Sequence, residues 1–200
     1  MSLNIISQNE QKVSVKLKGI PLQYANALRR ICLNGVPIYA IDTVDMMINS
    51  SIMADEGIAH RLGLIPLKTE LSAVEQGNES DKVMFTLDSG EATETRTVLS
   101  GELKSLDDVV KPISDNIPIV TLAPGQRLKL ETYARLGRGT EHAKWNSANV
   151  SILTESNNDD ERILTVETTG SLEPQYIILS SVEELSKRLN EFKKILSDLK

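Results

Sequence analysis

Apolar and polar residues alternate near the start of the chain. Residues 12–18 carry valine and leucine between lysine and serine, which predicts a strand with one buried and one solvated face. Gly19 ends the alternation, and from Pro21 apolar residues recur at helical spacing as far as Asn34-Gly35. This predicts a helix that begins at proline and stops at glycine. Its apolar surface is wider than a simple surface helix needs, so we expect a second partner besides its own sheet.

The middle of the chain follows a different pattern. Residues 38–49 predict a long strand, residues 55–62 a short helix, and the polar residues 69–81 a loop or linker. Further short strands are expected at residues 83–87, 94–99, 117–122 and 127–136, separated by Gly, Pro, Asp and Asn. Regularly spaced short strands are typical of a compact β-rich unit. The two ends of the chain look incomplete alone, so the pattern favours a β-rich domain inserted into an α/β domain.

The C-terminal segment has the clearest periodicity. Residues 163–168 predict a strand, and from about Pro174 the chain reads as a helix. Apolar residues along it are spaced alternately four and three positions apart: Ile178, Val182, Leu185, Leu189, Phe192, Leu196 and Leu199. That heptad spacing is typical of a helix packed lengthwise against another helix. The alternative is a helix that lies on its own sheet, since three heptads are a short signal.

Composition excludes several classes of protein. The 200-residue chain has a net charge of −6, so we expect no broad nucleic-acid-binding surface, which would need clustered Lys and Arg. Cys32 is the single cysteine, so no intramolecular disulfide or cysteine-based metal cluster can form. We expect no signal peptide and no membrane-spanning segment, and therefore a cytoplasmic protein.

No catalytic pattern stands out. Glu56 and His60 are four residues apart on a predicted helix, which is also a metal-ligand spacing, but without a third ligand a surface hydrogen bond or ion pair is the better interpretation. The chain has no phosphate-binding glycine motif and no nucleophile motif. We therefore expect no catalytic residue and no metal site.

Two basic segments are candidates for protein contacts. A glycine-containing loop at residues 137–145 carries the chain's single tryptophan, Trp145, together with Arg138, His142 and Lys144. It either presents these side chains to a partner or is a solvated loop around a packed tryptophan. Arg29 and Arg30 are adjacent on the first predicted helix, so at least one should leave the apolar face. They either form a solvated face or anchor a partner's carboxylates or carbonyls.

Five segments together resemble a known family. Residues 24–31, with the sequence YANALRRI, resemble the first-helix motif of the RNA polymerase alpha-like family. That family includes the bacterial alpha N-terminal domain, the eukaryotic third-largest subunit and their archaeal counterpart. The other segments resemble its archaeal and eukaryotic branch and follow in family order: residues 36–42, 55–67, 136–145 and 167–172.

The resemblance implies an α+β fold and an assembly role. It implies a discontinuous dimerisation domain, residues 1–50 plus 160–200, interrupted by an inserted β-rich domain, residues 51–159. It also implies a non-catalytic subunit of DNA-dependent RNA polymerase, whose C-terminal seam pairs with the small alpha-like subunit L. The second-largest catalytic subunit and subunits N and P are implied as further partners, with nucleic acid reached only through the complex. The candidate residues for those contacts are Arg29, Arg30, Glu56, His60, Arg61, Arg138, His142, Lys144 and Trp145.

One departure from the family concerns cofactors. Some archaeal members carry a cysteine-rich insertion before the last strand, where this chain has only the polar residues 154–161. We therefore expect no iron–sulfur cluster, and an archaeal origin is favoured. Two other functions stay open at this point: a homodimeric regulatory or ligand-binding protein that uses the same helix, and a stand-alone enzyme with a two-domain cleft.

Overall fold

The computed structural model describes residues 2–70, 82–156 and 161–198. By internal contacts the chain divides into two units. Unit 1 comprises Met1–Pro37 and Arg138–Lys200, and unit 2 comprises Ile38–Gly137. The chain thus leaves the first unit, builds the second and returns, as the incomplete ends of the sequence predicted.

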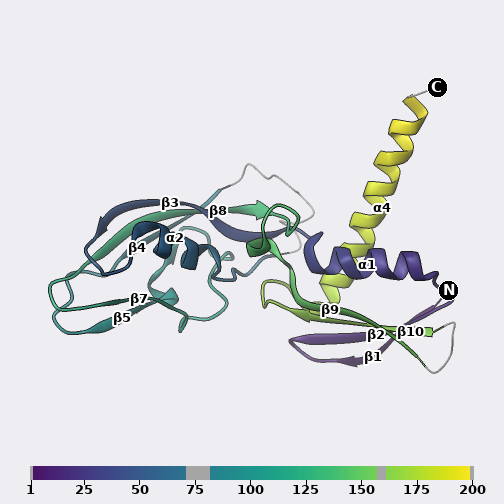
Figure 1. The fold of residues 1–200 in the computed structure, drawn as a ribbon, viewed down its shortest axis with the longest axis horizontal. Helices are drawn as coiled ribbons and strands as arrows, with labels where there is room; N and C mark the ends of the chain where they lie inside the picture. Colours follow the sequence, from purple (N-terminus) through teal and green to yellow (C-terminus); the bar gives the residue numbers. More distant parts are fainter. Residues whose placement is uncertain (1, 71–81, 157–160, 199–200) are drawn as a thin grey trace. The chain divides into compact units, whose positions relative to one another are not determined.

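Unit 1 is built on a four-stranded antiparallel sheet (Figure 1). Its strands are β1 (Ser2–Gln8), β2 (Lys12–Lys18), β9 (Ala148–Glu155) and β10 (Glu161–Thr168), in the order β1-β2-β10-β9. The alternation predicted for β2 is confirmed, because Val13, Val15 and Leu17 are all buried. The central position of β10, between β2 and β9, joins the two ends of the chain in one sheet.

Two helices pack on this sheet. Helix α1 (Leu22–Asn34) lies against β9 and against α4 (Pro174–Asp198), which also contacts β10 and β2. Helix α1 follows Pro21, whose φ of −54° suits a helix start. Its C-cap residue is Gly35, where an added Cβ would lie 2.7 Å from the Cγ2 atom of Ile31. Glycine is therefore needed there for close approach rather than for an unusual φ.

Unit 2 has two antiparallel sheets and a short helix. The larger sheet has the order β3-β8-β4-β6, from β3 (Ile38–Asn49), β8 (Leu128–Gly137), β4 (Val83–Asp88) and β6 (Lys104–Ser105). Strands β5 (Arg96–Leu99) and β7 (Pro118–Leu122) form the smaller sheet, and α2 (Asp55–Gly63) packs against β3 and β7. Buried residues from all these layers, including Phe85 and Leu62, form one hydrophobic core. This confirms the predicted compact β-rich insertion.

The boundaries of the two units differ from the predicted ones. Residues 38–50 belong to unit 2, because β3 pairs along its length with β8. Residues 138–159 belong to unit 1, because β9 pairs with β10. Strands β1 and β9 were not predicted at all. The predicted linker at residues 69–81 lies mostly outside the described residues.

Candidate partner-binding surface

The first turns of α4 are fixed within unit 1. Ile177, Ile178, Ser180 and Ser181 are buried, and the Ser181 hydroxyl donates a 2.6 Å hydrogen bond to the Ile177 carbonyl. This part of the helix lies against the sheet and against α1. The start of the predicted heptad seam is thus buried in the core of unit 1.

The rest of the seam emerges from that core. Ile178 is 7% exposed and Leu185 is half-buried, but the other described members of the seam are about half-exposed. These are Val182 at 47%, Leu189 at 52%, Phe192 at 59% and Leu196 at 49%, with Ile195 beside them at 59%. Leu199 lies outside the described residues. Figure 1 shows this half of α4 extending beyond α1 and the sheet. We call the exposed seam residues Val182, Leu189, Phe192 and Leu196 the α4 stripe.

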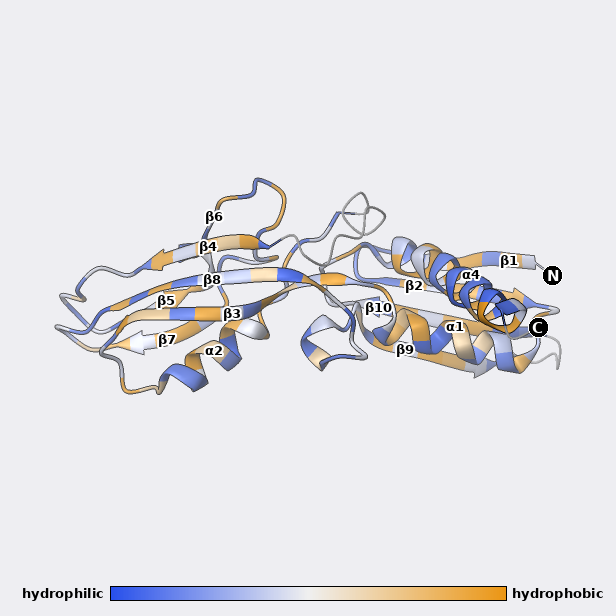
Figure 2. Cartoon of the chain, turned by 90° about the horizontal axis from the view of Figure 1, so that it is seen from above, coloured by the Kyte–Doolittle hydropathy of each residue, from blue (hydrophilic) through white to orange (hydrophobic). Residues whose placement is uncertain are grey.

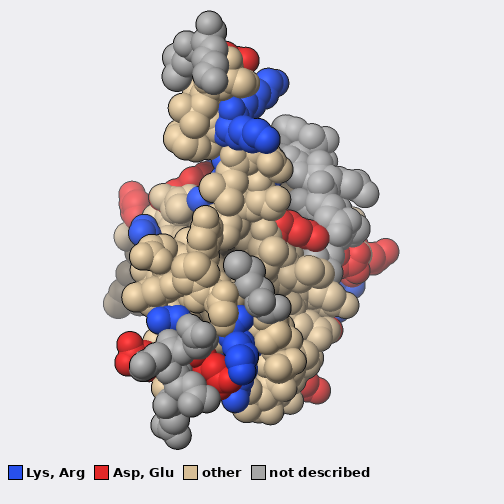
Figure 3. Space-filling model, turned by 90° about the vertical axis from the view of Figure 1, so that its right-hand side faces the viewer, with Lys and Arg blue, Asp and Glu red and all other residues tan. Residues whose placement is uncertain are grey.

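The exposed part of α4 carries charged side chains beside the α4 stripe, among them Lys187 and Arg188. Hydrophobic and hydrophilic residues interleave along α4 in Figure 2. Figure 3 shows Lys and Arg along one side of the protruding helix, while its other side is uncharged. Glu184 accepts a 2.8 Å contact from Arg188 and lies 3.5 Å from the Nε atom of Arg138. Both ion pairs lie within unit 1 and involve the charged side chains of α4, not the residues of the stripe.

The loop at residues 138–145 is organised around a buried tryptophan. Trp145 is 3% exposed, and the Lys144 ammonium group lies 4.2 Å from the centre of its ring. The His142 Nδ1 atom accepts the Lys144 N–H at 3.1 Å, at the start of the short helix Ala143–Trp145. Of the two interpretations of this loop, the structure favours the packed tryptophan. Trp145 is not an exposed anchor, because unit 1 and Lys144 cover it.

The two arginines of α1 have different surroundings. Arg29 is partly buried: its Nε atom donates to the Asn26 Oδ1 atom at 2.9 Å, and the Ser151 hydroxyl donates to the Arg29 carbonyl at 2.8 Å. Arg30 is exposed. The expectation that at least one of them leaves the apolar face is confirmed. Arg29 helps to fix α1 on β9, which leaves Arg30 as the better candidate for an external contact.

Helix α2 presents polar residues to solvent. Glu56, His60 and Arg61 are exposed, and Arg61 donates a 2.7 Å hydrogen bond to the Pro118 carbonyl. Among the residues that the structure describes, no group of three or more His, Cys, Asp or Glu side chains could hold a metal ion. Glu56 and His60 are therefore interpreted as surface residues of α2.

The sequence patterns did not predict the exposure of several apolar residues. Leu3 and Ile5 on β1, and Leu22 and Tyr24 at the start of α1, are about half-exposed. In unit 2 the tip residue Ile52 is 95% exposed. The only signal for β1 was its composition, since residues 2–8 contain no charged side chain. Its polar–apolar alternation covers only residues 2–5, which is too short to predict a strand.

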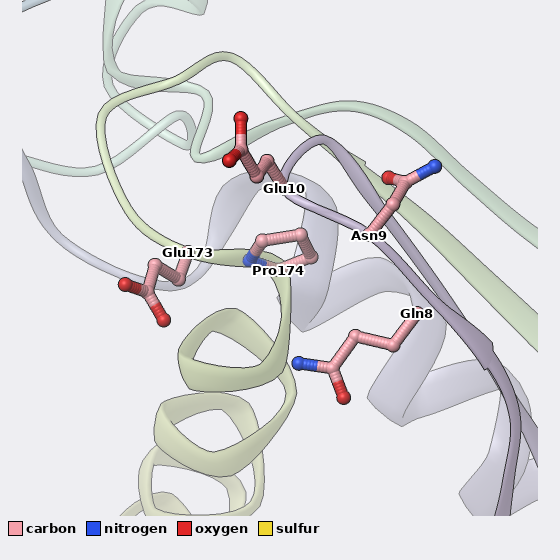
Figure 4. Close-up of a pocket in the computed structure, with 5 residues that line it drawn as sticks. All are labelled: Gln8, Asn9, Glu10, Glu173 and Pro174. Carbon is pink, nitrogen blue, oxygen red and sulfur yellow. The ribbon is translucent and has the colours of Figure 1, made fainter.

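A surface hollow lies where the β1–β2 turn meets the start of α4 (Figure 4). It is lined by Gln8, Asn9, Glu10, Glu173 and Pro174. The Asn9 side chain is occupied locally, because its Oδ1 atom accepts the backbone N–H groups of Gln11 and Lys12. The other polar groups of the lining are the amide of Gln8 and the carboxylates of Glu10 and Glu173.

Cys32 is a structural residue. It is fully buried between α1 and its neighbours, and the Ser147 hydroxyl donates a 2.9 Å hydrogen bond to the Cys32 carbonyl. Burial raises the pKa of its thiol to about 11, against a smaller opposing effect of a hydrogen bond from Ser181. A buried thiol that stays protonated is a poor nucleophile and a poor metal ligand.

A comparison with protein families decides the identity of the fold. A family model described as the RNA polymerase Rpb3/RpoA insert domain matches residues 44–158, more than half of the chain. The chain belongs to the Rpb3/RpoA family. The predicted resemblance to the RNA polymerase alpha-like family is confirmed, and so is the α+β class with an inserted β-rich domain.

Curated archaeal relatives from this family share their printed name. A protein of Pyrococcus furiosus, named DNA-directed RNA polymerase subunit Rpo3, is 47% identical over 72% of this chain. Proteins of the same name from Thermococcus kodakarensis and Methanosphaera stadtmanae are 45% and 33% identical, over 72% and 93% of the chain. The chain spans 56% of the length of the Pyrococcus and Thermococcus relatives and 77% of the Methanosphaera one.

The Rpb3/RpoA match and the α4 stripe lie in different parts of the chain. The matched residues 44–158 include most of unit 2, the Trp145 loop and β9, whereas α4 lies beyond them. In the described part of the chain, no helix combines the length and the apolar character needed to cross a membrane.

Proposed function

We propose that this chain is a non-catalytic assembly subunit of a DNA-dependent RNA polymerase. It pairs with the small alpha-like subunit, called L in archaea, and the pair then receives the catalytic subunits. The observation that carries the proposal is the α4 stripe, which leaves Val182, Leu189, Phe192 and Leu196 about half-exposed at heptad spacing. The names of the curated relatives, all RNA polymerase subunits, support the same assignment.

The size of the stripe suits a protein contact. If a partner covers roughly 500 Å² of it, the gross gain is roughly 12 kcal/mol at about 25 cal/mol per Å². Lost rotational and translational freedom and side-chain ordering offset much of this. The heptad spacing favours a helix as the element that packs on the stripe, because knobs at that period fit the holes of a facing helix.

Contacts with the other subunits form the second part of the proposal. The exposed side chains of Arg30, Glu56, His60 and His142 are available for the second-largest catalytic subunit and for subunits N and P. Arg29, Arg61, Arg138, Lys144 and Trp145 have contacts within their own units and would act mainly by shaping those surfaces. The proposal needs no cofactor, gives nucleic acid only indirect contact through the complex, and places the protein in the cytoplasm.

Co-expression with the small alpha-like subunit of the same organism tests the proposal. We expect a one-to-one heterodimer by light scattering after size exclusion. Leu189→Asp places a carboxylate in the stripe and should weaken pairing at least about a hundredfold, because a buried unpaired charge is costly. Lys187→Ser is a matched control, since it changes the net charge by the same amount at an exposed position on the opposite side of α4.

Each outcome separates the candidate functions. A homodimer that ignores the small subunit would replace the proposal by the self-pairing regulatory protein. Turnover by the isolated chain, retained after metal removal and add-back, would favour the enzyme. Normal pairing by the Leu189→Asp variant would contradict the assignment of the stripe even if a heterodimer forms.

A further inference from the structure

Strand β1 is an edge strand with an uncovered apolar face. In the antiparallel register Leu3 lies opposite Leu17 and Ile5 opposite Val15. Directly opposite residues point to the same face of a sheet. Leu17 and Val15 are 1% and 2% exposed, whereas Leu3 and Ile5 are 48% and 57% exposed. The two β1 side chains therefore lie on the face that α1 and α4 cover over β2, β10 and β9, but these helices leave them open.

This edge has little of the protection that free edges usually show. Exposed edge strands of soluble proteins commonly carry lysine, proline or inward-pointing charges that discourage pairing with another chain. Residues 2–8 contain none of these, although the register shifts between Ile5 and Ser7. A seven-residue uncharged edge with half-exposed aliphatic side chains is therefore expected to be covered in the working assembly.

The uncovered face of β1 lies beside α4. The Gln8 side chain, at the end of β1, donates a 2.8 Å hydrogen bond to the Gln175 side chain in the first turn of α4. Leu179 and Val182 follow Gln175 by four and seven residues, so they lie on the same side of the helix. They are 52% and 47% exposed. The side of α4 that turns toward β1 is thus apolar as well.

The area of the α4 stripe alone is small for a stable interface. Standard interfaces bury about 800 Å² on each partner. The stripe offers on the order of 500 Å², since its members are about half-exposed. Leu3, Ile5 and Leu179 add on the order of 300 Å² at similar exposure. Together the two surfaces reach about the size of a standard interface.

We propose that β1 and α4 form one continuous binding surface, and that the partner which covers the α4 stripe also covers Leu3 and Ile5. This rests on the proposed function and deepens it. Charge defines the partner further: β1 carries no charged residue, and Gln175, Leu179, Val182 and Ser186 on the adjoining side of α4 are uncharged. The partner surface over β1 is therefore expected to be apolar and uncharged.

Substitutions on the two faces of β1 test this surface. Ile5→Asp, in the full-length chain paired with the small alpha-like subunit, should raise the dissociation constant about tenfold or more. Asn4→Asp is the matched control, because Asn4 lies opposite Lys16 on the other face and should change pairing less than about twofold. The free Ile5→Asp chain should melt within a few degrees of wild type, since Ile5 is exposed. Ile5→Ala gives a milder variant if that chain does not fold.

A second measurement follows β1 directly. On pairing, hydrogen exchange of the β1 amides should slow in the wild-type complex and slow less in the Ile5→Asp complex. The Leu189→Asp variant distinguishes pairing through the α4 stripe from the additional contact at β1. If it abolishes pairing while Ile5→Asp and Ile5→Ala pair as wild type, the proposed function stands and the β1 surface is overturned. If the wild-type chain itself fails to pair with the small subunit, both proposals fail.

Discussion

The two units of this chain treat their apolar residues differently. Unit 2 collects residues from two sheets and α2 in one hydrophobic core, around Phe85, Leu62 and Leu130. Of the eighteen large apolar side chains that are exposed among the described residues, twelve belong to unit 1 and six to unit 2. Unit 2 thus encloses its own core, whereas unit 1 leaves apolar surface on α4 and β1. The insertion thus buries most of its large apolar side chains within itself, whereas the exposed apolar surface of unit 1 is what the proposed partner would cover.

Two phenylalanines give the largest expected contrast. Phe85→Ala removes a fully buried ring from the core of unit 2 and should lower the free energy of unfolding by about 3–5 kcal/mol. Phe192→Ala removes a ring that is 59% exposed in the free chain and should change it by less than about 0.5 kcal/mol. Urea unfolding of the isolated chain measures both. Similar losses for the two variants would show that the far end of α4 is covered within the chain.

Polar contacts inside unit 1 should have an intermediate effect. Ser147 is fully buried and donates to the Cys32 carbonyl, so Ser147→Ala leaves that acceptor without this hydrogen bond. We expect a loss of about 1 kcal/mol in the free energy of unfolding. Thr154→Ala on the exposed end of β9 is the control and should be near neutral, since its hydrogen bond to the Ile163 carbonyl is long, at 3.4 Å. A neutral Ser147→Ala variant would argue against a fixed α1.

The pH dependence of folding stability should differ between the two units. The stability should change least near neutral pH. Hydrogen bonds from Arg127 lower the pKa of Asp88 to about 2 from 3.8. A carboxyl with a lowered pKa stabilises the fold above its unfolded pKa, so this contribution is lost as the pH falls from about 4 through 2. Burial raises the pKa of Cys32 to about 11 from 9.0. Its contribution is present below pH 9 and is lost as the pH rises through 11.

Local hydrogen exchange across pH tests these assignments. Acid should open unit 2 around Asp88 first, and Asp88→Asn should remove that part of the acid sensitivity. Alkali should open unit 1 around α1, and Cys32→Ala should remove that part of the alkaline sensitivity. The Cys32 thiol should also resist alkylation at pH 8 until the chain unfolds. Rapid alkylation of the folded chain would contradict the burial of Cys32.

The elements that the sequence predicted are those with a strong internal pattern. Strand β2, helix α1 and the long α4 show the periods of a half-covered strand and of amphipathic helices, and all three are confirmed. Strand β1 was missed because only residues 2–5 alternate between polar and apolar, and Ile6 after Ile5 breaks this short pattern. Strand β9 was missed because polar residues run through it, and because it was counted with the inserted domain.

The candidate site was predicted in part. The heptad seam on α4 was readable, because apolar spacing along one helix depends only on local sequence. Its division into a buried start and an exposed continuation was not, because that depends on where β10, β2 and α1 end beneath it. For Trp145, Arg29 and Arg30 the sequence left two interpretations open. Burial of the ring favours the packed tryptophan, and the contacts of Arg29 with β9 fix that side chain within unit 1, whereas for Arg30 both interpretations stay predictions.

Periodicity and motif order are local properties of the chain, so they were enough to predict the classes of element, the inserted arrangement, the family and the apolar seam of α4. The boundaries of the units, the pairing of β9 with β10 and the set of uncovered residues became known only from the three-dimensional fold. Those depend on which distant segments meet. The β1 surface is the clearest case, since its exposure depends on how far α4, which is distant from it in sequence, extends over the sheet.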